Sequence, residues 1–245
     1  MTLALRYAVR SDVGLLREGN EDSAYAGPHL LAVADGMGGH AAGEVASSAT
    51  ITTISSLDSE RPGIDLVSAL AEAVAMANMR LQELVISDPA TEGMGTTLTA
   101  MLWLDGHAAL CHIGDSRAYL VRDGEVFQIT HDHTLVQSLL DEGKLTAEEA
   151  ASHPQREMLR RALGSSNAEP DLQLREARAG DRYLLCSDGL HEAAPAESLK
   201  QVLREVSDPD AAAARLIELA IHGGGHDNIT CIVADVVPAD VPATT

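Results

Sequence analysis

Aromatic and basic residues are scarce in this chain of 245 residues. One Trp, one Phe and four Tyr make up 2% of it, which leaves too few rings for the stacking platforms that hold single-stranded nucleic acid. Acidic residues number 37 and Lys plus Arg 17, which gives a formal net charge of −20. A surface this negative repels phosphate backbones and anionic lipid. We therefore exclude nucleic acid as a partner.

Long apolar runs and a set of paired cysteines are also missing. The longest stretch without a charged residue is 45–57, thirteen residues rich in Ser and Thr, whereas a membrane span needs about 20 apolar residues. The first ten residues alternate as a strand does, without the apolar block of a signal peptide. Three cysteines, Cys111, Cys186 and Cys231, argue against a disulfide framework and fit a reducing compartment. We expect a cytoplasmic location and no membrane contact within this chain, and leave open an anchor beyond residue 245.

The spacing of apolar residues predicts a single α+β domain. They recur at helical spacing over 64–86, and 43–57 is a second candidate helix after a glycine-rich turn. Asp-Gly pairs beginning at Asp105 and Asp123 favour tight hairpins, so the middle of the chain is predicted to be an antiparallel meander. Further helices are predicted at 196–206 and 210–221, and strands at 1–10, 96–104, 107–113, 117–122, 125–129, 172–176, 182–187 and 228–236.

Residues 131–165 interrupt the strands with short helical pieces. Thr146 and Glu149 have the spacing of a capping box, which predicts a helix start. The segment is long for a connection in a compact domain, so we expect it to protrude, with His131 and His133 as solvated residues. The predicted domain covers 1–237, and 238–245 form a tail.

Aspartates mark the ends of several apolar runs. Asp35 follows the run 30–34 and Asp188 follows 183–187, and each precedes a glycine, which leaves a carboxylate at the edge of a buried sheet. Carboxylates that converge without a cation repel by about 4 kcal/mol per close pair at an effective dielectric of 20. Oxygen ligands suit Mg²⁺, Mn²⁺ or Ca²⁺ better than Zn²⁺. Each aspartate alone is equally explained as a turn or helix cap, but together they indicate a hard-metal site if the strand ends meet. The other aspartates at strand ends are Asp22, Asp115 and Asp227.

Six short motifs follow one another in a characteristic order. They are Arg17-Glu-Gly-Asn-Glu-Asp22, Ala34-Asp-Gly-Met-Gly-Gly-His40, Gly93-Met-Gly-Thr-Thr97, Gly114-Asp-Ser-Arg117, Ser187-Asp-Gly-Leu190 and Asp227-Asn228. Together they resemble the successive motifs of the PP2C family, the metal-dependent Ser/Thr protein phosphatases, and in particular actinobacterial enzymes that oppose receptor-type Ser/Thr kinases. The likeness runs from about residue 5 to residue 237, nearly the whole chain.

The resemblance implies an α-β-β-α sandwich of two antiparallel sheets flanked by helices, with 131–165 as a mobile flap. It also implies a centre of two or three Mn²⁺ or Mg²⁺ ions, which lower the pKa of a bridging water and clamp the phosphate. In this scheme Asp35 bridges two metals and the Gly36 carbonyl binds the second. Asp188 and Asp227 complete the first metal's protein ligands.

Further roles follow from the same resemblance. Asp22 and Glu21 hold waters around the second metal, and Asp115 with Asp188 binds a third. Arg17 grips the substrate phosphate through its planar fork of donors. Some relatives carry a His directly after the Asp-Gly pair as general acid. The implied activity is hydrolysis of phosphoserine and phosphothreonine in proteins, including Ser/Thr kinases, by a monomer.

This chain departs from that pattern at one position, because Met37 stands where such a general acid would be. His40 lies three residues further on and is a candidate substitute, or it caps or packs locally. Glu157 in the flap is a candidate oxygen ligand of the third metal. The alternative to an enzyme is a non-catalytic phosphoprotein-binding module on the same scaffold. Loss of the metal aspartates would mark such a module, and all of them are present.

Three other motifs are interpreted as coincidences. Cys111 and Arg117 have the Cys-x5-Arg spacing of cysteine-dependent phosphatases, but a strand is predicted where that loop needs a helix. The glycines of 36–41 mimic a dinucleotide fingerprint without a parallel βαβ series around them. His222 and His226 have zinc-ligand spacing, but three glycines lie between them and deny them a helix.

Overall fold

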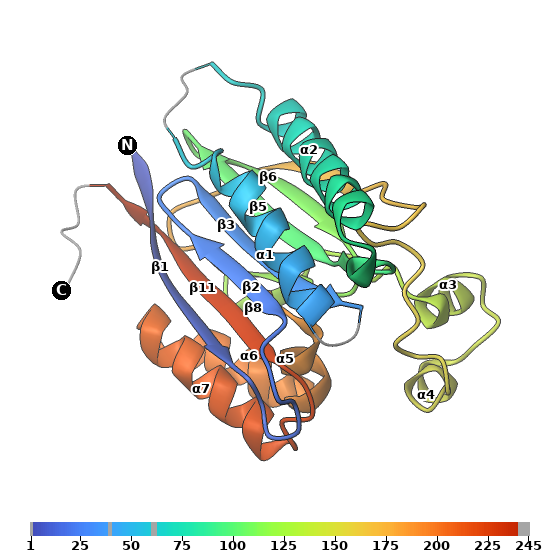
Figure 1. Cartoon of the computed structure of the whole chain (residues 1–245). Helices are drawn as coiled ribbons and strands as arrows, with labels where there is room; N and C mark the ends of the chain where they lie inside the picture. The colour runs from blue at the N-terminus through green and yellow to red at the C-terminus, as the bar shows by residue number, and fades with distance from the viewer. Residues whose placement is uncertain (1, 39–40, 60–62, 240–245) are drawn as a thin grey trace.

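Two antiparallel sheets packed face to face form the centre of the molecule (Figure 1). The computed structural model describes residues 2–38, 41–59 and 63–239. One sheet runs in the order β1 (Leu3–Asp12), β11 (Ile229–Pro238), β10 (Arg182–Cys186), β7 (Arg117–Arg122) and β8 (Glu125–Gln128). The other runs β2 (Asp22–Ala26), β3 (Leu30–Met37), β5 (Leu98–Leu104), β6 (His107–Ile113) and β9 (Asp171–Glu176), with the short β4 (Gly95–Thr96) paired to β3. The last strand thus lies between the first strand and β10.

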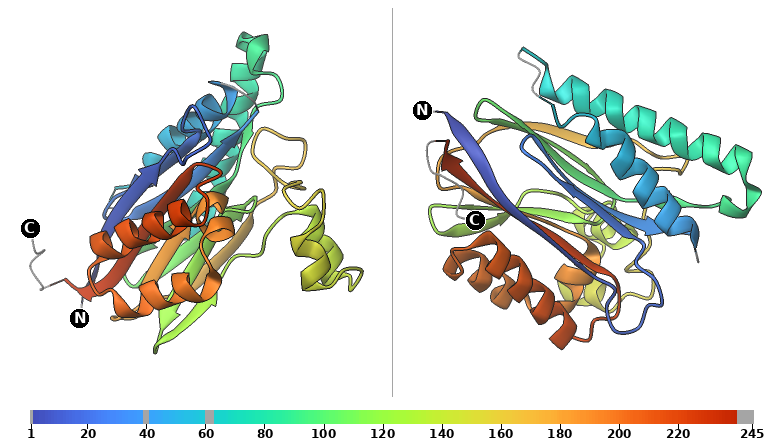
Figure 2. Two further views of the ribbon diagram at one scale, coloured as in Figure 1. Left: turned by 90° about the horizontal axis from the view of Figure 1, so that it is seen from below. Right: turned by 60° about the vertical axis from the view of Figure 1, so that its left-hand side comes forward.

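Helices cover the outer face of each sheet (Figure 2). The β3 sheet carries α1 (Ala41–Ser55) and α2 (Leu66–Ser87), and a short 3-10 turn, η1 (Pro89–Thr91), follows α2. The β11 sheet carries α5 (Asp188–Ala193), α6 (Ala196–Glu205) and α7 (Pro209–His222). The layers are therefore helix, sheet, sheet and helix, so the predicted α-β-β-α sandwich is confirmed.

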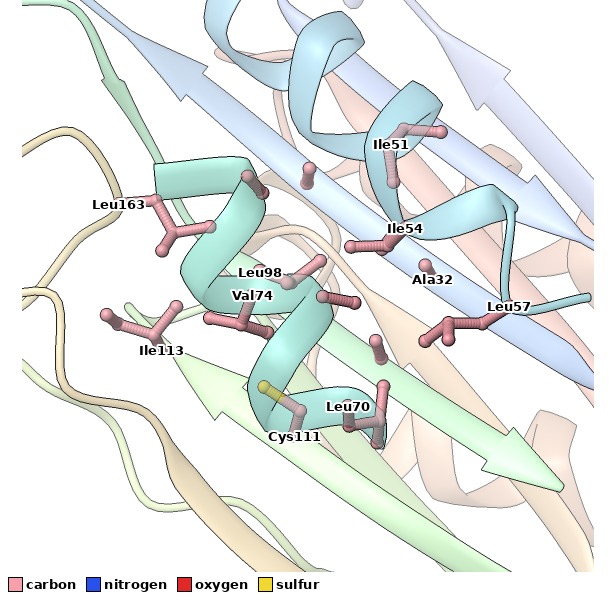
Figure 3. Packing of buried hydrophobic residues seen from close by; sticks show 14 of the residues in the cluster. Ala32, Ile51, Ile54, Leu57, Leu70, Val74, Leu98, Cys111, Ile113 and Leu163 are labelled. Atoms are coloured by element: carbon pink, nitrogen blue, oxygen red, sulfur yellow. The ribbon is translucent and has the colours of Figure 1, made fainter. Parts of the chain in front are cut away.

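Alternation along β3 explains how this stack holds together. Leu30 and Ala32 point to the outer cluster with the helices, whereas Leu31 and Val33 point into the space between the sheets. Figure 3 shows the outer cluster, in which Leu70 of α2 lies over the same sheet. A strand that is apolar on both faces must be covered on both, and this requirement produces the layers.

Local sequence signals set the turns and helix starts. Asp105 and Asp123 have φ values of 51° and 55°, and the glycine after each is also at positive φ, as tight hairpin turns require. Asp65 begins α2 by accepting the backbone N–H of Ser68 at 2.7 Å. These features confirm the predicted meander and the helix predicted over 64–86. The strand β2 was not predicted, because its residues are mostly small or polar and show no clear alternation of apolar and polar side chains.

The flap, residues 131–165, leaves the sandwich at one end (Figure 1). It contains α3 (Leu135–Asp141) and α4 (Ala147–Ala151), and the predicted capping box of Thr146 and Glu149 is present. Its two ends are tied to each other by a bridge between Thr134 and Leu159. Leu163 then returns into the core and is fully buried.

Candidate metal centre

Asp22 and Asp35 lie directly opposite each other on β2 and β3. The backbone of Asp35 is fixed on both sides, because its N–H donates to the Thr97 hydroxyl at 2.9 Å and its carbonyl accepts from the Thr96 hydroxyl at 2.8 Å. Asp35 and Gly36 are still part of β3, whereas the sequence places them after the strand. The carboxylate of Asp35 is therefore attached to a rigid strand.

The second sheet contributes Asp188 and Asp227 at the ends of its central strands. Asp188 is the first residue of α5, two residues after β10, and Asp227 lies two residues before β11. The two sheets are joined here, because the Ser187 hydroxyl donates to Oδ2 of Asp22 at 2.8 Å. The strand ends that the sequence places far apart thus meet at one end of the sandwich.

Burial and mutual repulsion raise the pKa values of these carboxyls. Burial raises the pKa of Asp35 well above its usual range, and the charges of Asp188 and Asp22 raise it further. Asp188 is raised in the same way, first by burial and then by Asp115. Burial also raises the pKa of Asp22 to about 6 and that of Asp115 to about 7. Such a group binds either protons or cations.

Two oxygens in this group have no hydrogen-bond partner among the residues that the structure describes. Oδ1 of Asp22 and Oδ1 of Asp188 are buried and accept no hydrogen bond. A buried carboxylate oxygen without a partner is costly, and a hard divalent cation satisfies it. Among the residues that the structure describes, no three acidic, His or Cys side chains form a closed ligand cage. The acidic group thus presents oxygen donors of the kind that suit Mn²⁺ or Mg²⁺.

Gly36 and Glu21 lie beside this group. A side chain at Gly36 would collide with the Gly43 carbonyl, and it would approach the Glu21 carbonyl to 2.7 Å, so only glycine fits there. The N–H of Gly36 donates to the Glu21 carbonyl at 3.1 Å, and the N–H of Glu21 donates to Asn228 at 2.8 Å. Asn228 therefore links the loop before β2 to the strand β11.

Arg17 forms an ion pair with one of the predicted ligands. Its Nη2 lies 2.6 Å from Oδ2 of Asp227. The arginine side chain is 53% exposed, so its guanidinium is accessible to solvent beside Asp227.

Two predicted residues are not brought into this group. His40 lies outside the described residues. Glu157 is in the exposed part of the flap, where its carboxylate is 67% exposed and accepts from Arg156 at 2.8 Å. Burial raises the pKa of Glu192, and the charge of Glu157 raises it further. Glu192 in turn raises the pKa values of Asp115 and Asp188. Sequence reasoning missed Glu192, although its position four residues after Asp188 on a helix is a usable signal.

The prediction that His133 is solvated is wrong. It is buried, and its ring contacts Gly114 and Asp171, because the start of the flap packs under the turn before β7. His131 is exposed as expected and pairs with Asp141 at 2.7 Å. Sequence reasoning also missed His191, whose ring is within 3.0 Å of the Asp115 carbonyl.

The rejected motifs have ordinary structural roles. Burial raises the pKa of the Cys111 thiol to about 12, so it is no nucleophile, and Arg117 instead binds Asp132 through two nitrogens. All three cysteines are free and buried. His222 ends α7, where its Nδ1 lies 2.6 Å from the carbonyl of Glu218. Of the dinucleotide-like stretch, residues 39 and 40 lie outside the described part.

Comparison with known proteins identifies the family of this chain. Residues 20–219 match the protein phosphatase 2C family, and the chain belongs to that family. It is 56% identical over 244 residues to the serine/threonine protein phosphatase PstP of Mycobacterium tuberculosis. The aligned region covers all of this chain and 47% of that protein. The chain thus spans about half the length of that relative. It is also 34% identical to the protein phosphatase PhpP of Streptococcus pneumoniae, over 96% of this chain and 99% of the relative.

Solved structures agree with this membership. The crystal structure of the M. tuberculosis serine/threonine phosphatase PstP/Ppp superposes with a TM-score of 0.93 at 55% identity, covering 96% of this chain and all of that one. The catalytic domain of PstP in complex with two manganese ions gives a TM-score of 0.91 at 54% identity, covering 97% of this chain and all of the other. No helix in the described part of this chain is long and apolar enough to cross a membrane.

Proposed function

We propose that the chain hydrolyses phosphoserine and phosphothreonine in proteins at a centre of two or three Mn²⁺ or Mg²⁺ ions. The observation that carries this proposal is the buried group of carboxylates contributed by both sheets, with unpartnered oxygens on Asp22 and Asp188. Membership of the protein phosphatase 2C family supports it, as does the likeness to a phosphatase domain with two manganese ions.

The proposed ligand roles are those that the family resemblance implies. Asp35 bridges two ions from its fixed position on β3, and the Gly36 carbonyl serves the second of them. Asp188 and Asp227 complete the first ion's set from the other sheet. When bound, the ions supply the positive charge that activates a water molecule and holds phosphate oxygens. Water-mediated contacts come from Asp22 and Glu21, and Asp115 with Asp188 holds a third, weaker ion.

Arg17 binds the substrate phosphate in this proposal. Its side chain is half exposed and its partner Asp227 belongs to the metal ligands, so the guanidinium lies where a phosphate on the ions would meet it. His40 is the proposed general acid for the leaving alkoxide, since the residue after the Asp-Gly pair is Met37. Glu157 is the proposed flap ligand of the third ion.

The proposed partners are phosphorylated proteins, Ser/Thr kinases among them, acted on by a monomer in the cytoplasm. The alternative is a phosphoprotein-binding module without catalysis. Such a module does not need a buried group of carboxylates, whose burial is energetically unfavourable. Those carboxylates are all present at one end of the sandwich, which favours the enzyme.

The test is hydrolysis of a phosphothreonine peptide by the whole chain. We expect activity with Mn²⁺, loss of it with excess chelator, and recovery when Mn²⁺ is added back. Cys111→Ser is the control and retains activity within about twofold, because its buried thiol has a pKa raised to about 12. Activity that survives chelation but is abolished by Cys111→Ser would contradict the proposal. Tight phosphopeptide binding without turnover would favour the binding module.

A further inference from the structure

His133, near the start of the flap, holds both backbone polar groups of Gly114. Its N–H donates to the Gly114 carbonyl at 2.8 Å, and the N–H of Gly114 donates to the ring Nδ1 of His133 at 3.2 Å. Gly114 directly precedes Asp115 in the turn between β6 and β7. The direction in which Asp115 leaves the turn is therefore set by a residue of the flap.

Both ring nitrogens of His133 have polar partners. Since Nδ1 accepts from Gly114, the proton of the neutral ring is on Nε2, which donates to Oδ2 of Asp171 at 3.2 Å. Asp171 begins β9, just after the flap, and also accepts from Arg161 at 3.0 Å. The ring thus lies between the turn on one side and the exit of the flap on the other.

The remainder of the turn has little freedom. Gly114 has a φ of +107° and packs so tightly on Thr97 that an added Cβ would lie 2.6 Å from it. The Ser116 hydroxyl lies 2.8 Å from that of Thr97, and the His191 ring donates to the Asp115 carbonyl at 3.0 Å. With its backbone fixed in this way, the turn presents the Asp115 carboxyl in one direction.

We propose that His133 is a positioning residue that fixes the Asp115 carboxyl and thereby couples the flap to the affinity of a divalent cation bound there. The proposal rests on the metal centre of the proposed function. Outer residues that orient a ligand typically change metal affinity by roughly 10- to 100-fold when replaced. The link to the flap is direct, because the N–H of Arg160 donates to the His133 carbonyl at 2.7 Å and Leu159 pairs with Thr134.

Two substitutions separate the two bonds of the ring. In His133→Asn the amide oxygen takes a position near that of Nδ1 and still accepts from Gly114. In His133→Gln the amide nitrogen takes a position near that of Nε2 and keeps only the bond to Asp171. Asp115→Asn identifies which phase of a Mn²⁺ titration depends on Asp115. His131→Asn is the matched control, two residues away on the same segment, with an exposed side chain that does not contact the turn.

The readout is Mn²⁺ binding by the whole chain, followed through the paramagnetic resonance signal of the free ion, with thermal unfolding to verify that each variant is folded. We expect His133→Gln to weaken the phase that Asp115→Asn removes by at least about 10-fold and to spare the tighter phase. We expect His133→Asn and His131→Asn to stay within about threefold of wild type. Equal losses in the Asn and Gln variants, or no loss in either, would overturn the proposal.

Amide hydrogen exchange tests the clamp in the wild-type chain, whether or not the Gln variant folds. The Gly114 amide is expected to be protected, and an amide that exchanges as fast as in an unfolded peptide would overturn the clamp. Turnover of the wild-type chain on a phosphothreonine peptide is measured separately. If turnover is absent while the two Mn²⁺ phases respond as expected, the proposed function fails and the positioning role stands.

Discussion

Arg17 and Asp227, which are 210 positions apart in the sequence, form an ion pair with a distance of 2.6 Å between Nη2 and Oδ2. The first is the proposed phosphate-binding residue and the second a proposed metal ligand. Their side chains are 53% and 36% exposed, and pairs of this kind contribute at most about 1 kcal/mol to stability. Each charge is thus free to take a stronger partner: a phosphate for Arg17 and a cation for Asp227.

Replacing Arg17 is expected to weaken substrate binding more than turnover. A hydrogen bond to a charged group contributes about 1.5–3 kcal/mol, so Arg17→Ala should raise the KM for a phosphothreonine peptide by about 10-fold or more. The kcat should fall less, because the contact exists in both ground and transition state. Arg17→Lys recovers part of the loss. Steady-state kinetics check this, and both parameters within twofold of wild type would leave Arg17 a surface residue.

Removing the charge of Asp35 is expected to abolish most of the activity. An interaction of several kcal/mol with the metal centre corresponds to a rate loss on the order of 10³-fold for Asp35→Asn, and Asp188→Asn should behave alike. Asp123→Asn is the matched control, since Asp123 also precedes a glycine but lies in a hairpin at φ 55°, a conformation that Asn accepts. Full phosphopeptide turnover in Asp35→Asn would remove the bridging role from this residue.

His112 is expected to make the fold sensitive to acid. Burial lowers its pKa to about 4, whereas an unfolded chain binds this proton near pH 6.5. Between pH 6.5 and pH 4 the unfolded state therefore binds more protons at this residue, and the contribution of His112 to the free energy of unfolding falls as the pH falls, by up to about 3 kcal/mol. His112→Gln should flatten this part of the pH profile in urea denaturation. An unchanged profile would mean that His112 does not carry the effect.

The flap arginines are expected to act differently from each other. Arg161 is bound to Asp171 at 3.0 Å, so it supports the flap, whereas Arg160 has an exposed side chain. Arg160→Gln should lower kcat/KM for a phosphoprotein by about 10-fold at low salt and spare a small aryl phosphate. Arg161→Gln should slow both substrates. The difference for Arg160 should shrink at high ionic strength, and equal slowing by Arg160→Gln would contradict a role in substrate attraction.

Much of this molecule follows from local patterns in the sequence. The hairpins at Asp105 and Asp123, the capping box at Thr146 and the buried strand before Asp35 each depend on a few neighbouring residues, and all are present. Family resemblance, rather than periodicity, indicated that the aspartates of distant strands share one site. What the sequence did not indicate is the partner of each side chain.

Partner choice depends on register and packing across the sandwich. The facing positions of Asp22 and Asp35 need the register of β2 against β3, and β2 itself was not predicted. The pair of Arg17 with Asp227 needs a loop at one end of the chain to meet the start of the final strand. A buried role for His133 depends on how the flap packs under the turn before β7, which no short-range pattern encodes.

The place of β11 has a consequence for how the protein is made. This strand occupies the middle of its sheet, paired with β1 on one side and β10 on the other, and Asp227 stands just before it. While residues 227–238 are still inside the ribosome, the first strand has no neighbour in its sheet and the acidic group lacks one of its members. The proposed metal centre thus cannot be complete before this strand has left the ribosome. The sheet is completed in a late step, when β11 pairs with β1, a strand synthesised more than two hundred residues earlier.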